Sequence, residues 1–581
     1  MSRLPQMENC PVSFASGRFL RLGGVLLLGA AFAACGSDTT EPDPVTVAAP
    51  TGVAAASLST TSIQVTWNQV SNATGYAVDR SSGAGGNFTT VGTGLTSTAY
   101  TDAGLSPSTQ YTYQVRAVNG TVKSSNSSSA SATTGQEGPK TATITGVTLS
   151  RTLYSDTTYT LSGFVKVSNG ATLTIQAGTT IIGDTLVPGS SLWILRGSKL
   201  VANGTATAPV VFTSARSAGN RAPGDWGGIV IVGNAPINRT ANPIFTEGPT
   251  GAAENYAGGT NFNDDSGSLT YVRIEFAGFD VSNGGGQELN SISSYAVGRT
   301  TKYDYVQSVA GLDDSFEFFG GGPDVRHMVS FESGDDHFDW TEGTRVRGQY
   351  LIALQTSVLT PRPGTGTTSS DPRGFEGDGC ENDKAGCTYA NAPYSQPVWA
   401  NFTIVGPGTG VFSATDGNAA VVRRGSGGNF VNGILARWPG VGFSIRDAES
   451  KTLMDADSLY IRNVYLVENG ANFEAAASGR FGFVVGDSAA QWSVSTATMA
   501  AVFAGALPGS ATAVTEANLN LGLATGAAAR TGGKNSFAGT PLAARVTNYF
   551  GGDMPATAYV GALDPAAATP WYAGWTRWYR N

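Results

Sequence analysis

Between residues 50 and 134, apolar and polar residues alternate in short runs. Ile63, Val65 and Trp67 are separated by single polar residues, and residues 111–117 repeat this pattern. A period of two predicts strands that bury one face, and turn residues recurring about every ten positions are typical of a β-sandwich. We therefore predict a small all-β domain in this part of the chain.

From about residue 140 the apolar runs become shorter and more regularly spaced, as in residues 269–278, 303–311 and 325–331. Residues 312–320 (LDDSFEFFG) and 334–342 (GDDHFDWTE) are nearly copies of each other, offset by 22 positions. Such a period predicts a solenoid whose strands stack about 4.8 Å apart. We predict a right-handed parallel β-helix over residues 140–581. A large jelly roll is the alternative, but it would not place near-identical motifs one coil apart.

Two segments near the C-terminus have helical character. Residues 495–507 are rich in Ala and end at Pro508, which is a helix stop signal. Trp571, Trp575 and Trp578 have the spacing of one helix face. We expect a short helical cap here, because the open end of a solenoid must be covered.

The composition fits a turn-dense, all-β protein and excludes some functions. Gly accounts for 77 of 581 residues, and only 13% of residues are charged. The net charge of −8 and the lack of a basic stripe argue against a nucleic-acid partner. The two His residues leave little material for a His-based metal site.

The N-terminus has the pattern of an export signal. Arg residues precede an apolar run too short to span a bilayer comfortably, and the run ends in small residues. Phe32-Ala33-Ala34-Cys35 resembles a bacterial lipoprotein cleavage box, which implies that Cys35 is lipidated. Ordinary cleavage near Ala34 is the alternative. We predict a signal peptide (1–34), a tether (35–47) and a lipoprotein anchored in the cell envelope, on the outer membrane or cell surface.

Cys380 and Cys387 flank a short polar loop. In an oxidising compartment such a pair is expected to form a disulfide, which would contribute roughly 2–3 kcal/mol. A metal site is the alternative, but no further Cys or His lies nearby to complete four ligands.

The first domain resembles fibronectin type III domains. The resemblance is carried by residues 49–53 (APTGV), Trp67, and the spacing of Leu105, Pro107 and Tyr111. It covers residues 48–136 and implies a spacer or a binding platform.

The second domain resembles secreted and surface-attached bacterial proteins with a pectin-lyase-like β-helix. Residues 224–238, residues 263–278, the two Asp-Asp repeats and residues 574–576 carry this resemblance. We know of no established activity for that family, so the resemblance implies a fold and no reaction. The loop between Cys380 and Cys387 departs from the family pattern.

The Asp-Asp repeats predict a ladder of carboxylates. Aligning residues 371–378 as a third coil places Phe375 in the column of Phe316 and Phe338, and Arg373 in the column of Asp314 and Asp336. Since residues two apart share a strand face, we expect the Phe column to be buried. We expect the outward column to contain Glu317, Asp339 and Glu376, with Ser315 and His337 beside it.

Stacked carboxylates repel one another, and three arrangements relieve the repulsion. Nearby Arg residues can neutralise them, which would make the ladder structural. A hard cation can bridge them, and the candidate Ca²⁺ ligands are Asp313, Asp335, Asp339 and Glu376. A raised pKa can keep one acid protonated for catalysis, and the candidate catalytic residues are Asp313, Asp335, Glu317, Asp339 and His337.

These patterns favour a surface lipoprotein whose sandwich is a spacer and whose β-helix binds polysaccharide, matrix or another surface component. The first alternative is a glycoside hydrolase or polysaccharide lyase that uses the carboxylate ladder. The Asn-Thr-Asp, Gly-His-Gly and Arg-x-Lys motifs of β-helix pectinases are not found, which weakens this alternative. The second alternative is a purely structural surface protein.

Overall fold

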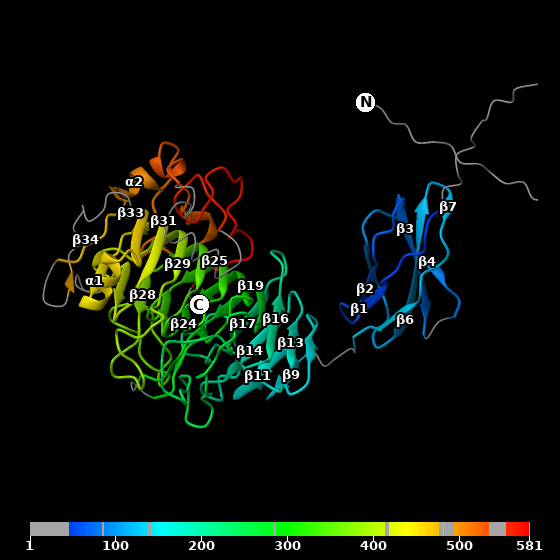
Figure 1. Cartoon of the computed structure of the whole chain (residues 1–581), viewed down its shortest axis with the longest axis horizontal. Coiled ribbons are helices and arrows are strands. Elements are labelled where there is room, and N and C mark those ends of the chain that lie inside the picture. Colours follow the sequence, from blue (N-terminus) through cyan, green and yellow to red (C-terminus); the bar gives the residue numbers. More distant parts are fainter. Residues whose placement is uncertain are drawn as a thin grey trace, which may run out of the picture.

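The computed structural model describes residues 46–83, 86–135, 141–282, 286–412, 417–475, 480–481, 493–533 and 554–579. The described residues form a nearly all-β structure (Figure 1). The predicted signal peptide and Cys35 lie outside them, as does all of the tether except its last two residues. Within the described residues, no helix is both long and apolar enough to cross a bilayer.

The first domain is a sandwich of two antiparallel sheets. One sheet contains β1 (Ala54–Ser57), β2 (Ser62–Thr66) and β5 (Ala99–Ala103). The other contains β3 (Gly75–Ser82), β4 (Thr89–Leu95), β6 (Gln110–Asn119), β7 (Val122–Lys123) and β8 (Ala130–Thr133). Ile63, Val65 and Trp67 lie in its core, as the alternation predicts. The Tyr111 hydroxyl accepts a hydrogen bond from the Ser106 amide at 3.1 Å, which fixes the corner before β6.

The second domain is a parallel β-helix with two long sheets. The larger sheet contains β9 (Thr141–Ile144), β10 (Arg151–Leu153), β11 (Thr158–Leu161), β13 (Thr172–Ile175), β14 (Thr180–Gly183), β16 (Lys199–Asn203), β17 (Val210–Ser214), β19 (Gly267–Glu275), β23 (Lys302–Val309), β25 (Asp324–Phe331), β27 (Arg347–Leu354), β29 (Val398–Val405), β31 (Gly428–Ala436), β33 (Leu459–Val467) and β36 (Ser493–Ala497). The smaller sheet contains β12 (Phe164–Val167), β15 (Ser191–Ile194), β18 (Ile229–Val232), β22 (Ile292–Tyr295), β24 (Phe316–Phe319), β26 (Phe338–Thr341), β28 (Phe375–Asp378), β30 (Ala420–Arg423), β32 (Val441–Arg446), β34 (Ala471–Phe473) and β35 (Arg480–Phe481).

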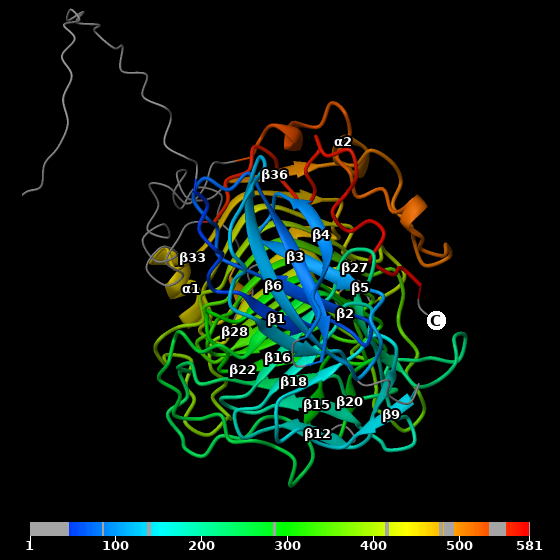
Figure 2. The ribbon, with the colours of Figure 1, turned by 90° about the vertical axis from the view of Figure 1, so that its right-hand side faces the viewer.

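Short elements complete the domain. They are the hairpin β20 (Phe279–Asp280) and β21 (Glu288–Leu289), the helices α1 (Ala448–Asp455) and α2 (Met499–Val502), and the 3-10 turns Glu516–Asn518 and Ala528–Arg530. Figure 2 shows the coils stacked behind one another, with the C-terminal segment (orange and red) outside the stack.

The strand register confirms the predicted repeat. Phe316 pairs with Phe338, and Phe338 pairs with Phe375. Their rings lie inside the coils with centroids 5.4 Å and 5.5 Å apart. Aromatic contacts of this kind add about 0.5–1.5 kcal/mol beyond the burial of their area, so this column holds the three coils in register.

The long strands of the larger sheet bend at one residue each. The bend positions have a positive φ angle and include Tyr271, Tyr305, His327, Tyr350 and Asn401. Four of these rings stack on the outer surface, with centroid distances of 4.3 Å, 4.2 Å and 4.8 Å along the column. We call these residues the kink column. Their stacked rings form an aromatic surface on the outside of the larger sheet, against which another segment can pack.

The C-terminal segment packs against this surface. The expectations of a helix over residues 495–507 and of a helical cap at the Trp residues were both wrong. Residues 495–507 do not form one helix: their start belongs to β36, which pairs with β33, and only α2 is helical. Pairing with an open sheet edge outweighs the helix propensity of the Ala residues. Trp571 and Trp575 lie on turns and Trp578 on the irregular segment after them. All three pack against the side of the larger sheet, where they cover apolar residues such as Phe331, and they do not cap its open end.

Candidate functional site

The Asp-Asp repeats lie in the turns that lead from the larger sheet into the smaller one. There each coil accepts a main-chain hydrogen bond from the next coil. The Asp314 amide donates to Asn290 Oδ1 (3.0 Å), the Asp336 amide to Asp314 Oδ1 (2.7 Å), and the Arg373 amide to Asp336 Oδ1 (2.6 Å). The predicted column of Asp314, Asp336 and Arg373 is therefore present, and its acids hold neighbouring coils together.

The outward column is also present. Glu317, Asp339 and Glu376 are register partners on β24, β26 and β28. They point away from the Phe column but are only 9%, 9% and 6% exposed, because long connections cover this face. The ladder is thus outside the coils yet largely shielded from solvent.

Arg residues neutralise one end of the ladder, as the structural alternative predicts. Glu376 pairs with Arg373 at 2.5 Å and with Arg423 at 2.8 Å. Asp378, on the same strand, pairs with Arg423 at 2.9 Å and with Arg424. These two Arg neighbours hold the pKa of Asp378 below its usual value, despite its burial.

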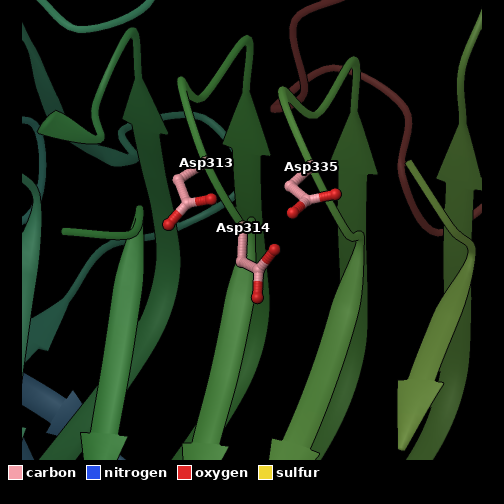
Figure 3. A group of neighbouring side chains, drawn as sticks. All are labelled: Asp313, Asp314 and Asp335. Carbon is pink, nitrogen blue, oxygen red and sulfur yellow. The ribbon is translucent and has the colours of Figure 1, made fainter. Parts of the chain in front are cut away.

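The other end has no such neutralisation. Within the described part of the chain, no Lys, Arg or His lies within ion-pairing distance of Asp313, Asp314, Glu317, Asp335 or Asp339. Carboxylate oxygens of Asp313, Asp314 and Asp335 lie within 4.8 Å of one another, and so do those of Asp314, Glu317 and Asp339. We call these groups the outer triad and the inner triad. Figure 3 shows the outer triad on two neighbouring coils, with Asp313 and Asp335 at equivalent positions.

Burial and mutual repulsion both raise the pKa of these acids. Burial, followed by the charge of neighbouring carboxylates, raises the pKa of Asp313, Glu317 and Asp339 well above the usual range. The same causes raise the pKa of Asp335 to about 7, although Arg373 opposes the shift. Each triad therefore favours either a bound proton or a bound cation.

The prediction that His337 lies beside the carboxylates was wrong. His337 is fully buried in the corner before β26, where its Nδ1 contacts Ser330 Oγ at 2.5 Å. Strand alternation begins only at Phe338, so His337 turns inward. Ser315 turns inward as well, and its hydroxyl accepts from Ser330 at 2.6 Å. Burial lowers the pKa of His337 to about 3, and no polymer can reach its ring.

The predicted disulfide between Cys380 and Cys387 is present, and its loop covers the inner triad. The connection between β18 and β19 holds this loop from the other side. Arg239 Nε donates to the Ala385 carbonyl at 3.2 Å, and the Thr240 amide donates to the Gly386 carbonyl at 3.1 Å.

These elements enclose the carboxylate pocket, a cavity of about 70 Å³. It is lined by Glu247, Glu317, Phe319, Asp339, Thr341, Glu342, Asp378, Glu381, Lys384 and Cys387. Sites for small organic ligands usually measure about 300–1,000 Å³, so the pocket suits an ion with water and excludes a sugar ring. The sequence analysis did not identify Glu247, Thr341 and Lys384 as site residues. Glu247 and Lys384 lie on irregular connections, Thr341 lies at the end of β26, and none of the three is repeated from coil to coil.

A family model described as a pectate-lyase-like beta helix domain matches residues 144–515, which is more than half of the chain. The chain belongs to this family. A second model, for the fibronectin type III domain, matches residues 48–134.

Curated relatives resemble the fibronectin type III region alone. A poly(3-hydroxybutyrate) depolymerase from Ralstonia pickettii is 46% identical over 87 residues, which are 15% of this chain and 16% of the relative. One from Delftia acidovorans is 38% identical over 81 residues, which are 14% of this chain and 15% of the relative. The chain thus spans about a sixth of the length of these proteins.

Among solved structures, a Fn3-like protein from Clostridium thermocellum is 38% identical, with a TM-score of 0.15. The match covers 16% of this chain and 98% of that protein.

Proposed function

We propose that this protein is a lipid-anchored component of the cell envelope whose β-helix binds an anionic polysaccharide, or a comparable surface polymer, through Ca²⁺ held at the outer triad. The observation that carries the proposal is the group of carboxylates without a cationic partner on two neighbouring coils. Ca²⁺ prefers six to eight oxygen ligands, so three protein carboxylates leave positions for polymer oxygens.

Accessibility favours the outer triad over the inner one as the polymer site. Asp313 and Asp335 are partly exposed, whereas the inner triad lies under the disulfide loop. Asp339 and Glu376 were expected as Ca²⁺ ligands together with Asp313 and Asp335. Glu376 is already paired with two Arg residues, and we therefore leave it out of the proposed site.

Binding to a glycan array in CaCl₂ and in EGTA tests this proposal. The full-length protein should bind uronate-rich or sulfated glycans only with Ca²⁺, and Asp313→Asn with Asp335→Asn should abolish binding. Asp156→Asn, an exposed acid far along the solenoid, is the matched control and should bind normally. Binding that is unchanged by EGTA and by the double substitution would overturn the proposal.

Catalysis on a polysaccharide is the second candidate function. One observation favours it: the pKa of Asp335 is raised to about 7, which suits a general acid or base near neutral pH. Reducing-sugar and unsaturated-product assays on polymers found in the array measure it. Activity retained by Asp335→Asn with Asp339→Asn would exclude the ladder as its source.

The anchor and the spacer complete the proposal. The curated relatives carry a similar fibronectin type III region in enzymes named for a polymer substrate, which supports a role near polymers for this module. We expect metabolic labelling with a palmitate analogue to mark the wild-type protein and not Cys35→Ser. Removal of residues 48–134 should leave glycan binding intact, because the domain is a spacer in this proposal.

A further inference from the structure

We propose that the carboxylate pocket is a second, structural cation site, in which a Ca²⁺-like ion bound by Glu317, Asp339 and Thr341 locks the disulfide loop and the β18–β19 connection onto the coils. This site is separate from the outer triad in function. It requires no polymer.

The charge balance of the pocket favours a bound cation. Three of its acids are already neutralised: Glu342 by Arg239 at 2.8 Å, Asp378 by Arg423, and Glu381 by Arg424. The other three acids, Glu247, Glu317 and Asp339, have no ion-pairing partner within the residues that the structure describes. Lys384 lies at the rim, 3.9 Å from Glu381, and its charge also acts on Glu247.

The hydroxyl of Thr341 provides an independent pointer. Thr341 follows Asp339 by two residues on β26, so both side chains face the pocket. It is only 9% exposed, and its Oγ1 has no hydrogen-bond partner among the described residues. Its hydroxyl therefore borders the cavity and can ligate an ion there.

The type of ligand follows from the donors and the size of the cavity. Carboxylate and hydroxyl oxygens without nitrogen or sulfur suit a hard cation. A cavity of about 70 Å³ accommodates an ion and a few waters. The irregular arrangement over several elements fits the flexible coordination of Ca²⁺ better than the strict octahedron of Mg²⁺.

The position of the pocket assigns the role of the ion. Its walls come from β24 and β26, from the disulfide loop through Glu381, and from the β18–β19 connection through Glu247. These two loops are already linked to the coils by the ion pairs of Arg239 with Glu342 and of Glu381 with Arg424, and an ion bound beneath them adds to these links. Without it, the charges of Glu317 and Asp339 repel each other within 4.8 Å on β24 and β26, and the charge of Glu317 also repels that of Glu247 on the β18–β19 connection.

Hydrogen exchange and thermal denaturation of the full-length protein test the inference. After dialysis against EGTA, CaCl₂ should raise the melting temperature and slow exchange in residues 241–257 and 380–391, whereas MgCl₂ should do so only weakly. Thr341→Val should weaken the Ca²⁺ response about 10-fold, and Thr341→Ser, which keeps the hydroxyl, should retain it. Asp339→Asn should abolish the response but remain folded, since it removes one of the repelling charges.

The outer triad supplies the control. Asp313→Asn with Asp335→Asn should lose glycan binding and keep the Ca²⁺ effect on these loops. Failure of the polymer proposal therefore leaves this inference standing, and the reverse also holds. The inference is overturned if Ca²⁺ changes neither melting nor exchange in the wild-type protein, or if Asp339→Asn responds to Ca²⁺ as the wild type does.

Discussion

Replacing Arg373 by Met tests whether this residue neutralises the end of the carboxylate ladder. Its guanidinium lies 2.6 Å from Asp371, 2.5 Å from Glu376 and 3.4 Å from Asp336, and its side chain is only 10% exposed. Met preserves most of the packing volume but leaves three acids without this partner. Removing one partner of a buried ion pair costs about 3–5 kcal/mol.

This loss of stability corresponds to a measurable fall in the melting temperature. For a domain of roughly 400 residues, the entropy of unfolding is about 0.8–0.9 kcal/mol per degree, so the melting temperature should fall by about 4–6 °C. Differential scanning calorimetry of the β-helix transition measures it. Arg326→Met is the matched control, because Arg326 is one-third exposed and its contact with Asp324 is 3.5 Å long, which is worth about 0–1 kcal/mol.

A rescue variant separates charge from packing. Adding Asp336→Asn to Arg373→Met removes an acid that has no other ion-pair partner among the described residues, and should restore part of the stability. The reasoning is refuted if Arg373→Met and Arg326→Met have equal, small effects, or if the second substitution lowers stability further.

Three further measurements bear on the fold. The buried His337 has a pKa of about 3, below the value of about 6.5 in the unfolded chain, so the unfolded state takes up the proton first as the pH falls. The free energy of unfolding should therefore fall by about 2 kcal/mol between pH 7 and pH 5. NMR titration of the two His rings checks this pKa, and a His337 midpoint near pH 6.5 would contradict it. Phe375→Ala should cost about 3–5 kcal/mol in denaturant unfolding, because its ring is fully buried, whereas Phe262→Ala at an exposed site should cost under about 0.5 kcal/mol. Gln307→Ala removes two hydrogen bonds to the main chain of residue 577, so amide exchange in residues 571–579 should accelerate, and exposed Lys302→Ala on the same strand should leave it unchanged.

The sequence predicted features that repeat and missed features that occur once. The 22-residue offset placed Phe316, Phe338 and Phe375 in one column and Glu317 and Asp339 in another, because stacking converts sequence period into spatial register. The inward turn of His337 was missed, because alternation fails at a corner. The pocket was missed as well, since its cover comes from connections whose folded positions have no periodic signal.

The position of the C-terminal tryptophans was missed for a related reason. Their spacing is that of a helix face, yet the aromatic kink column along the larger sheet determines where they pack. Trp575 lies against Tyr271 and Tyr305, with ring centroids 5.6 Å and 6.1 Å away. Such a column arises from left-handed bends in the strands, which a single sequence does not reveal.

The C-terminal segment has a mechanical consequence under the proposed anchoring at the N-terminus. In a simple solenoid each coil contacts only its neighbours, so tension at the first coil can peel coils away one at a time. Here the Trp575 carbonyl accepts from Arg273 on β19 at 2.8 Å, and the Gly561 amide donates to Asn432 on β31 at 2.9 Å. Once peeling reaches β19, pulling therefore loads bonds on β31 at the same time and must shear them together. Residues 561–575 thus link β19 to β31 along the outside of the stack. The coils between these two strands should therefore unfold together under tension.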